Sequence, residues 1–204
     1  MLEGKNISFK YKSGEPLFEN ITISIKQGER VGLVAKSGYG KSTLAKILAG
    51  FIKPQKGEVL IGGKPISKGD FNPVQLIYQH PEKAINPRWK LREVLEEGGV
   101  LEDQLIEEMG IERNWLNRYP NELSSGELQR FCIARSLGKD IRFLIADEIT
   151  TMLDAISQAQ IWSSILKIID QRNIGLLMIT HNIHLANRIC TRTIDLERMT
   201  EIGK

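Results

Sequence analysis

The stretch from Ala35 to Thr43 constrains the fold of this chain more than any other, and it reads Ala-Lys-Ser-Gly-Tyr-Gly-Lys-Ser-Thr. An apolar run at 31–34 precedes it, and a helical pattern at 44–49 follows it. Strand, glycine-rich loop and helix in this order form the structural context in which such loops hold phosphate groups. A glycine-rich turn without a ligand is the alternative, but the Lys-Ser pair near its end favours phosphate. We therefore expect the chain to bind a nucleoside triphosphate here.

Each residue type in this phosphate loop has a chemical reason. Gly38 and Gly40 let the backbone turn its N–H groups inward without Cβ clashes, and the following helix N-terminus adds partial positive charge. Lys41 can reach the outer phosphates, and the Ser42 hydroxyl can hold Mg²⁺. Ala35 stands where the strict pattern has glycine, which is tolerable if it needs no positive φ. The expected cofactor-binding residues of the loop are Ala35, Lys36, Ser37, Gly38, Tyr39, Gly40, Lys41, Ser42 and Thr43.

The whole chain narrows the class of protein. Its 204 residues suggest one or two domains, and its formal charge of +3 names no partner. Basic residues are scattered, so we expect no nucleic-acid partner. Cys132 and Cys190 lie far apart in the sequence, which fits buried thiols in a reducing cytoplasm. Neither a signal peptide nor a membrane-spanning run is visible, so we expect other chains to carry it to any membrane.

Two kinds of strand pattern are present. Alternating apolar residues at 7–11 and 21–25, and a second pair of strands at 58–61 and 64–66, predict a small antiparallel layer. Four further runs, 31–34, 74–78, 143–146 and 176–180, predict strands of a second sheet. The last two are continuous apolar runs, as expected for strands that are buried on both faces of a parallel sheet.

Polar chemistry follows each apolar run. The phosphate loop follows the first run, Gln79 the second, Asp147 and Glu148 the third, and His181 the fourth. Because open α/β sheets bind ligands at the carboxyl ends of their strands, we expect these residues to share one site.

The segment from about 84 to 138 is helical and charged, and it predicts a helical subdomain inserted into the α/β core of one domain, 1–204. Seven glutamates and one aspartate lie between 93 and 112, and we prefer a solvated helical face to a docking patch. An apolar stripe after Asp154 predicts another helix with this residue at its N-cap. The fold class is therefore α/β, with a mainly parallel sheet, an antiparallel layer and a helical insertion.

Residues 123–127 read Leu-Ser-Ser-Gly-Glu, 143–148 read Phe-Leu-Ile-Ala-Asp-Glu, and 150–154 read Thr-Thr-Met-Leu-Asp. Together with the phosphate loop, these motifs resemble those of the ATP-binding cassette subunits of ABC transporters. The first is similar to the family signature Leu-Ser-Gly-Gly-Gln, the second to the Walker B strand and the third to the D-loop. The resemblance covers nearly the whole chain and implies the ABC ATPase fold with a P-loop NTPase core.

The resemblance also implies an ATPase that uses ATP and Mg²⁺. Gln79 matches the Q-loop glutamine, and it would ligate Mg²⁺ together with Ser42 and, at closer or second-shell range, Asp147. Glu148 would orient and deprotonate the attacking water. His181 matches the switch histidine and would contact the γ-phosphate.

Several residues keep two interpretations. Tyr11 falls where the family places an aromatic ring on adenine, but it could instead pack in the antiparallel layer. Ser124, Gly126 and Glu127 would meet the ATP of a second cassette. Ser124 and Glu127 also have the spacing of a capping box, and Asp154 could serve as a cap as well as in the D-loop.

Partners follow from the resemblance. Family members clamp two ATP molecules between two cassettes, so we expect a second cassette in a heterodimer, with a homodimer as the alternative. We also expect permease subunits and, indirectly, an extracellular substrate-binding protein. The chain would then lie at the cytoplasmic face of a membrane. Asn86-Pro87-Arg88 resembles importers of oligopeptides, dipeptides and nickel. A soluble cassette acting in translation or DNA repair is the alternative, but it would need a second phosphate loop or a long heptad insertion.

The chain departs from the family pattern at Ile149, where proline is usual, and at Ser125 and Glu127, where glycine and glutamine are usual. A carboxylate at 127 that faced the partner's nucleotide would weaken that ATP site, whereas one that folded back as a cap would not. Gln129 and Arg130 are expected on the helix surface.

Overall fold

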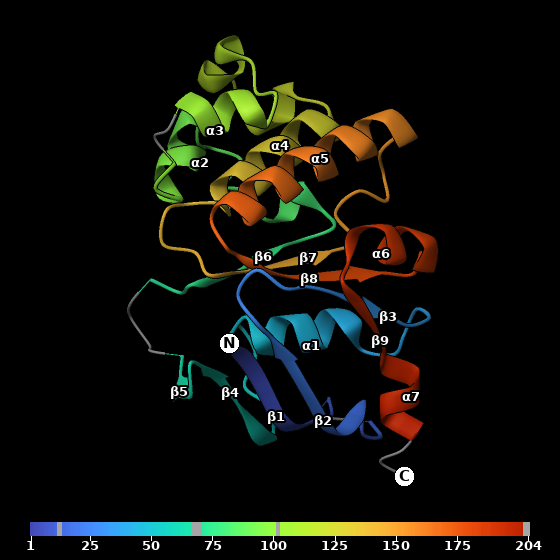
Figure 1. Cartoon of the computed structure of the whole chain (residues 1–204). Helices are drawn as coiled ribbons and strands as arrows, with labels where there is room; N and C mark the ends of the chain where they lie inside the picture. Colours follow the sequence, from blue (N-terminus) through green and yellow to red (C-terminus); the bar gives the residue numbers. More distant parts are fainter. Residues whose placement is uncertain (12–13, 67–70, 101–102, 202–204) are drawn as a thin grey trace.

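The computed structural model describes residues 1–11, 14–66, 71–100 and 103–201, and it shows two sheets stacked below a helical region (Figure 1). The lower sheet is antiparallel. It contains β1 (Leu2–Phe9), β2 (Phe18–Ile25), β4 (Lys56–Ile61) and β5 (Lys64–Pro65) in the order β2-β1-β4-β5. Both predicted antiparallel pairs are confirmed, and β1 joins them by pairing with β2 and β4.

The second sheet is parallel throughout. Its strands are β3 (Arg30–Val34), β6 (Val74–Ile77), β7 (Phe143–Asp147), β8 (Gly175–Thr180) and β9 (Arg192–Asp195), in the order β6-β7-β8-β3-β9. Every residue of β7 and β8 is buried, as expected for central strands covered on both faces. The four predicted strands are confirmed. The fifth, β9, was not predicted because it is a short edge strand without a buried apolar run.

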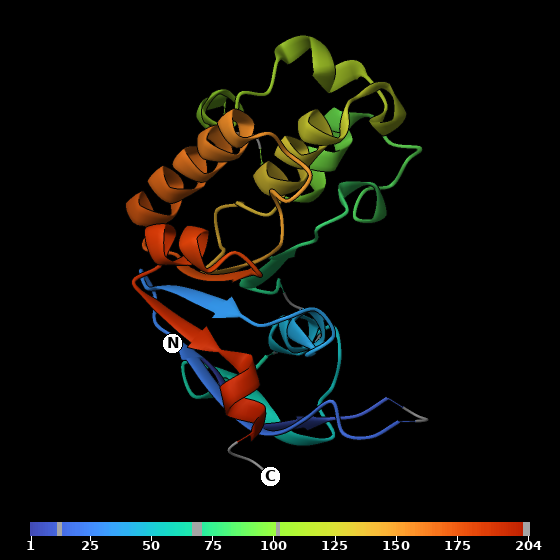
Figure 2. The same cartoon turned by 90° about the vertical axis from the view of Figure 1, so that its right-hand side faces the viewer.

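Helices cover both faces of the parallel sheet (Figures 1 and 2). Helix α1 (Lys41–Leu48) lies between the two sheets, where it packs in a cluster with Phe143 and Ile145. Leu144 and Ala146 point to the opposite face, in a cluster with α5 (Ala155–Gln171). Helix α6 (Ile183–Ile189) also covers that face, and α7 (Leu196–Glu201) runs beside β2. The predicted cap is confirmed, because Asp154 accepts hydrogen bonds from Ile156 N and Ser157 N, both at 3.0 Å.

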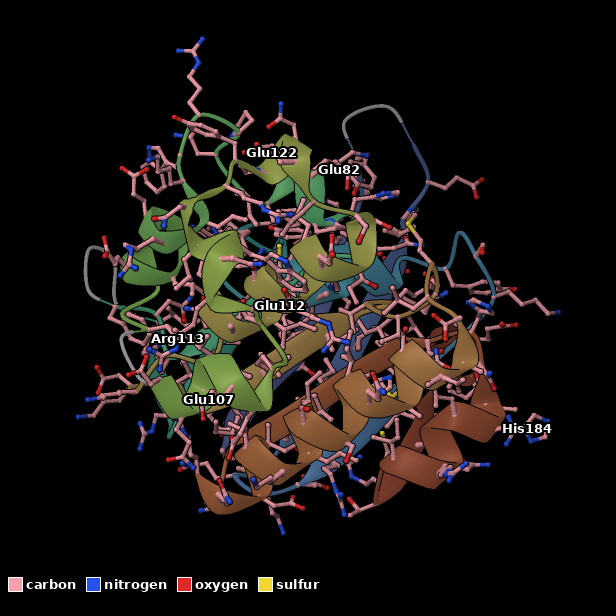
Figure 3. The ribbon with its side chains drawn as sticks, turned by 90° about the horizontal axis from the view of Figure 1, so that it is seen from above. Glu82, Glu107, Glu112, Arg113, Glu122 and His184 are labelled. Atoms are coloured by element: carbon pink, nitrogen blue, oxygen red, sulfur yellow. The ribbon has the colours of Figure 1, made fainter. Side chains whose placement is uncertain are left out.

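Between β6 and β7 the described elements are all helical. They are η1 (Pro81–Lys83), α2 (Leu91–Glu97), α3 (Asp103–Glu108), η2 (Arg113–Asn117), η3 (Pro120–Glu122) and α4 (Ser125–Arg135). Most of the described acidic side chains here are exposed, and Glu107 pairs with Arg113 across the surface at 3.7 Å (Figure 3). Glu102 lies outside the described residues. Within the described ranges, no helix is both long and apolar enough to cross a bilayer.

The expectation that Gln129 lies on the helix surface was wrong. Its side chain is only 2% exposed, because α4 is packed on several sides by the apolar cluster that contains Leu128 and Phe131. Its amide nitrogen is buried, and it has no hydrogen-bond partner among the described residues. Arg130 is half-buried and donates to the Met109 carbonyl at 2.8 Å, which ties α4 to the end of α3.

Candidate functional site

The phosphate loop turns sharply between β3 and α1. Gly38 and Gly40 have φ values of 91° and 86°, in the left-handed region that glycine adopts readily. A Cβ atom on Gly40 would lie 2.8 Å from the Leu17 side chain, so this position also needs glycine for space. Ala35 is not among the described residues with positive φ, which explains why alanine is tolerated there. The amides of the first turn of α1 therefore point into the loop.

Lys41 is held over the centre of this loop. Its ammonium nitrogen donates to the carbonyl of Ala35 at 2.7 Å and to that of Lys36 at 3.0 Å, and its side chain is only 7% exposed. An ammonium group has three N–H donors, so a third remains for a phosphate oxygen. The same nitrogen lies 4.0 Å from Glu148 Oε1, which brings the loop and the end of β7 together.

Asp147 ends β7 beside the first turn of α1, and its carboxylate forms a hydrogen bond with the Ser42 hydroxyl. Burial raises the pKa of Asp147, and the neighbouring Glu148 carboxylate adds to this effect, whereas the Ser42 hydrogen bond opposes it. A carboxylate and a hydroxyl in contact offer the hard oxygen ligands that Mg²⁺ prefers. The donor set of these two residues therefore fits Mg²⁺.

Glu148 adopts a backbone conformation that is unusual for a non-glycine residue, with φ at 51°. Its N–H donates to the Ile179 carbonyl at 3.1 Å, and its own carbonyl accepts from the amide and the hydroxyl of Thr151, at 3.3 and 3.0 Å. These bonds hold the sharp turn after β7. The turn places Glu148 Oε1 3.3 Å from His181 Nδ1, at the end of β8.

Gln79 and Tyr11 approach the same site from two further elements. The Gln79 amide donates to the Thr151 hydroxyl at 3.2 Å. The Tyr11 hydroxyl forms a 2.8 Å hydrogen bond with Thr43, and its ring contacts Phe9 edge-on with centroids 5.0 Å apart. Tyr11 therefore packs on the antiparallel layer, while the residue stays 55% exposed beside the loop. A cavity of about 360 Å³ is lined by Tyr11, Leu17, Ser37, Gly38, Gly40, Lys41, Ser42, Thr43, Gln79 and Glu148.

The signature residues lie apart from this cavity, at the start of α4. Ser124 and Glu127 form a reciprocal capping box: Glu127 Oε2 accepts from Ser124 N at 2.7 Å and from Ser124 Oγ at 2.8 Å. Ser124 Oγ accepts from Glu127 N at 3.3 Å. The hydrogen bonds from Ser124 hold the pKa of Glu127 below its ordinary value. Ser124, Gly126 and Glu127 line a second cavity that shares no residue with the first.

The role of Thr151 was not foreseen from the sequence. Its hydroxyl donates to the Glu148 carbonyl and accepts from Gln79, so it bridges two of the predicted site residues. Only its place in the D-loop motif could have drawn attention to it. A contact between Glu197 and the Lys36 amide was also not foreseen.

Comparison with known proteins agrees with this geometry. The family model described as "ABC transporter" matches residues 18–151, which is more than half of the chain. This chain belongs to the ABC transporter family. The predicted family, the ABC ATPase fold and the enzyme class are thereby confirmed.

Curated relatives of the cassette match nearly all of it. The Nickel import system ATP-binding protein NikE of Staphylococcus aureus (strain bovine RF122 / ET3-1) is 35% identical over 97% of this chain and 87% of its own length. The NikE protein of the N315 strain is 34% identical with the same coverage.

Solved structures of other cassettes share the fold. A dimeric post-hydrolysis state of the cassette MJ0796, bound to ADP and Pi, is 26% identical with a TM-score of 0.82, over 96% of this chain and 94% of the other. An ATP-binding subunit of an ABC transporter is 23% identical with a TM-score of 0.83, over 96% and 85%, and shows the fold alone.

Proposed function

We propose that this cassette is the ATP-hydrolysing subunit of an ABC importer for nickel or a nickel complex. One observation carries the substrate class: the similarity to proteins named as nickel import subunits extends over 97% of the chain. Peptide import, the other substrate class expected for this group, has no such support. The proposed unit is a single nucleotide-binding domain, residues 1–204, with the helical subdomain at about 84–138.

Different residues of the site bind the phosphates, the metal ion and the adenine. Lys41 and the loop amides bind the phosphates, and Ser42, Gln79 and Asp147 would hold Mg²⁺. When bound, Mg²⁺ neutralises charge on the phosphate oxygens. Tyr11 offers its exposed ring to the adenine.

Glu148 accepts the proton of the attacking water. The turn held by Thr151 fixes the direction of the Glu148 carboxylate toward the loop, where its Oε1 lies 4.0 Å from Lys41 Nζ. His181, 3.3 Å from the same oxygen, holds that carboxylate and contacts the γ-phosphate.

A second cassette completes the site. Ser124, Gly126 and Glu127 line a cavity that shares no residue with the one beside the phosphate loop, which supports a role at the nucleotide of another chain. Two cassettes facing each other would bring each signature to the other's loop. The dimeric MJ0796 structure bound to ADP and Pi supports a dimer of cassettes. We propose a heterodimer at the cytoplasmic face of the membrane, docked on permease subunits that are served by an extracellular binding protein. A homodimer and a cassette uncoupled from transport are the alternatives.

Binding of Mg-ATP to the isolated chain tests the phosphate site. At a hundredfold excess over the dissociation constant, ligand binding should add about 2.7 kcal/mol to the free energy of unfolding. Lys41→Ala should abolish most of this stabilisation in a thermal melt, whereas Lys53→Ala, an exposed lysine outside the site, should leave it intact. If Mg-ATP raised the melting temperature of both variants equally, the phosphate loop would not be the nucleotide-binding site.

Metal uptake by cells tests the substrate class. Cells in which the cassette carries Glu148→Gln should accumulate less nickel than wild-type cells and take up dipeptides normally. If these cells instead lost peptide uptake and kept a normal nickel content, the transported substrate would be a peptide and not nickel.

A further inference from the structure

Two charged side chains form hydrogen bonds with one peptide unit of the phosphate loop, one at its carbonyl and one at its amide. The carbonyl of Ala35 accepts a hydrogen bond from the Lys41 ammonium at 2.7 Å. The amide of the same peptide unit, Lys36 N, donates to Glu197 Oε1 at 2.7 Å. A cation, a peptide dipole and an anion therefore stand in line, although Glu197 is 156 residues beyond Lys41 in the chain.

The carboxylate of Glu197 is placed by a well-anchored segment. Strand β9 pairs with β3 beside the loop, and Leu196, the first residue of α7, is completely buried. Asp195 Oδ1 accepts from Glu197 N at 2.9 Å, which fixes the turn between β9 and α7. Arg192 ties the start of β9 to Glu29 at 2.6 Å. Glu197 is therefore held by β9 and α7, which are anchored independently of the phosphate loop.

Charge-assisted hydrogen bonds are about twice as strong as neutral ones, and hydrogen bonds in a chain polarise one another. An anion on the amide of a peptide unit makes its carbonyl a better acceptor, so Glu197 strengthens the bond from Ala35 O to Lys41. We propose that Glu197 is a positioning residue for ATP binding, which holds Lys41 in its phosphate-binding orientation through the Ala35–Lys36 peptide unit.

A purely structural role makes a different prediction. An acidic side chain in the first turn of α7 also interacts favourably with the helix dipole. If that were its whole role, substitution would loosen α7 without an effect that depends on Lys41. The two roles are therefore separable by combining substitutions at the two positions.

The experiment is a double-mutant cycle on the full chain, with the dissociation constant of Mg-ATP measured by fluorescence titration. Glu197→Ala should raise this constant roughly tenfold, as expected for losing about one charge-assisted hydrogen bond. Glu197→Gln should raise it by a smaller factor, because an amide oxygen still accepts from Lys36 N. Glu112→Ala, which removes an exposed carboxylate in the helical region, is the control and should leave it unchanged.

Lys41 decides between the two roles. In a Lys41→Ala background, Glu197→Ala should change the residual ATP affinity less than about twofold, because nothing remains to position. In the nearly isosteric Glu197→Gln variant, hydrogen exchange at the Lys36 amide should become faster while the α7 amides stay protected. An unchanged dissociation constant in Glu197→Ala, or a tenfold loss that persists without Lys41, would overturn the positioning role.

The role given to Glu197 rests on the proposed nucleotide site, and the experiment distinguishes failure of the site from failure of the role. Normal ATP binding by Lys41→Ala would refute the proposed site itself. Loss of binding by Lys41→Ala, together with normal binding by Glu197→Ala, would leave the site in place and refute only the role of Glu197.

Discussion

Glu127 is the residue at which the structure decides between two opposite expectations. In a signature that usually carries glutamine here, a carboxylate could face the partner's nucleotide or fold back onto its own helix. The structure shows the second arrangement, with Glu127 Oε2 bonded to the amide and the hydroxyl of Ser124. We therefore predict that Glu127 stabilises α4 and that Glu127→Gln costs the isolated chain a small amount of stability.

The magnitudes differ enough to test. Glu127→Ala removes the hydrogen bonds that the Glu127 carboxylate accepts from Ser124, and it should lower the free energy of unfolding by about 1 kcal/mol. Glutamine can still accept from Ser124 N, so Glu127→Gln should lose only the interaction of the charge with the helix dipole, about 0.3–1 kcal/mol. In a chain of this size a loss of 1 kcal/mol corresponds to roughly 2–4 °C in Tm. If the Glu127 carboxylate faced a phosphate about 5 Å away, the repulsion between the two charges would be about 3 kcal/mol at an effective dielectric of 20. This energy is larger than the stabilisation expected from capping.

Thermal melts of wild type and Glu127→Gln between pH 4 and 8 provide the assay. The pKa of Glu127 is lowered in the folded chain, so its charge stabilises the fold above its unfolded pKa of about 4.3. This contribution is lost as the pH falls through the folded pKa. The difference in Tm between the two proteins should be constant from pH 6 to 8 and should shrink at the acid end. A Glu127→Gln chain that melts above wild type at pH 7 would refute the capping role.

Two further substitutions test the site. Glu148→Gln should keep ATP binding and stop turnover, because the amide is nearly isosteric but cannot accept the proton. The measurement is the ATP retained in an assembled dimer. Hydrolysis at the wild-type rate would exclude Glu148 as the base. Gly40→Ala should weaken ATP binding and cost about 1–2 kcal/mol of stability, because the residue has a φ of 86° and its new Cβ would meet Leu17 at 2.8 Å. Gly14→Ala is its control, because a Cβ there meets no atom of the described residues within 4 Å. Equal melting of the two variants would contradict this expectation.

Much of the fold followed from local pattern. The alternation at 21–25 and the apolar run at 143–146 report directly which faces of a strand are buried, and both strands were predicted correctly. The carboxyl-end rule for parallel strands then predicted that Gln79, Glu148 and the phosphate loop would meet, and they line one cavity.

What the sequence did not predict depends on distant packing. The burial of Gln129 follows from the elements that surround α4, which its own polarity cannot reveal. The left-handed backbone of Glu148 is held by Thr151 and by the Ile179 carbonyl, and a glutamate does not indicate such a conformation in the way that glycine or asparagine does. The contact from Glu197 to Lys36 joins residues 161 positions apart, which no local pattern encodes.

The order of the parallel sheet has a consequence for synthesis of the chain on the ribosome. Strand β3, which carries the phosphate loop, lies between β8 and β9, and these two strands occupy residues 175–195. The strand neighbours that hold the loop are therefore translated long after the loop itself. During most of translation the nascent chain carries the nucleotide motif without the strands that hold it in place. We therefore expect nucleotide to stabilise the fold only after β8 and β9 have been synthesised and have paired with β3.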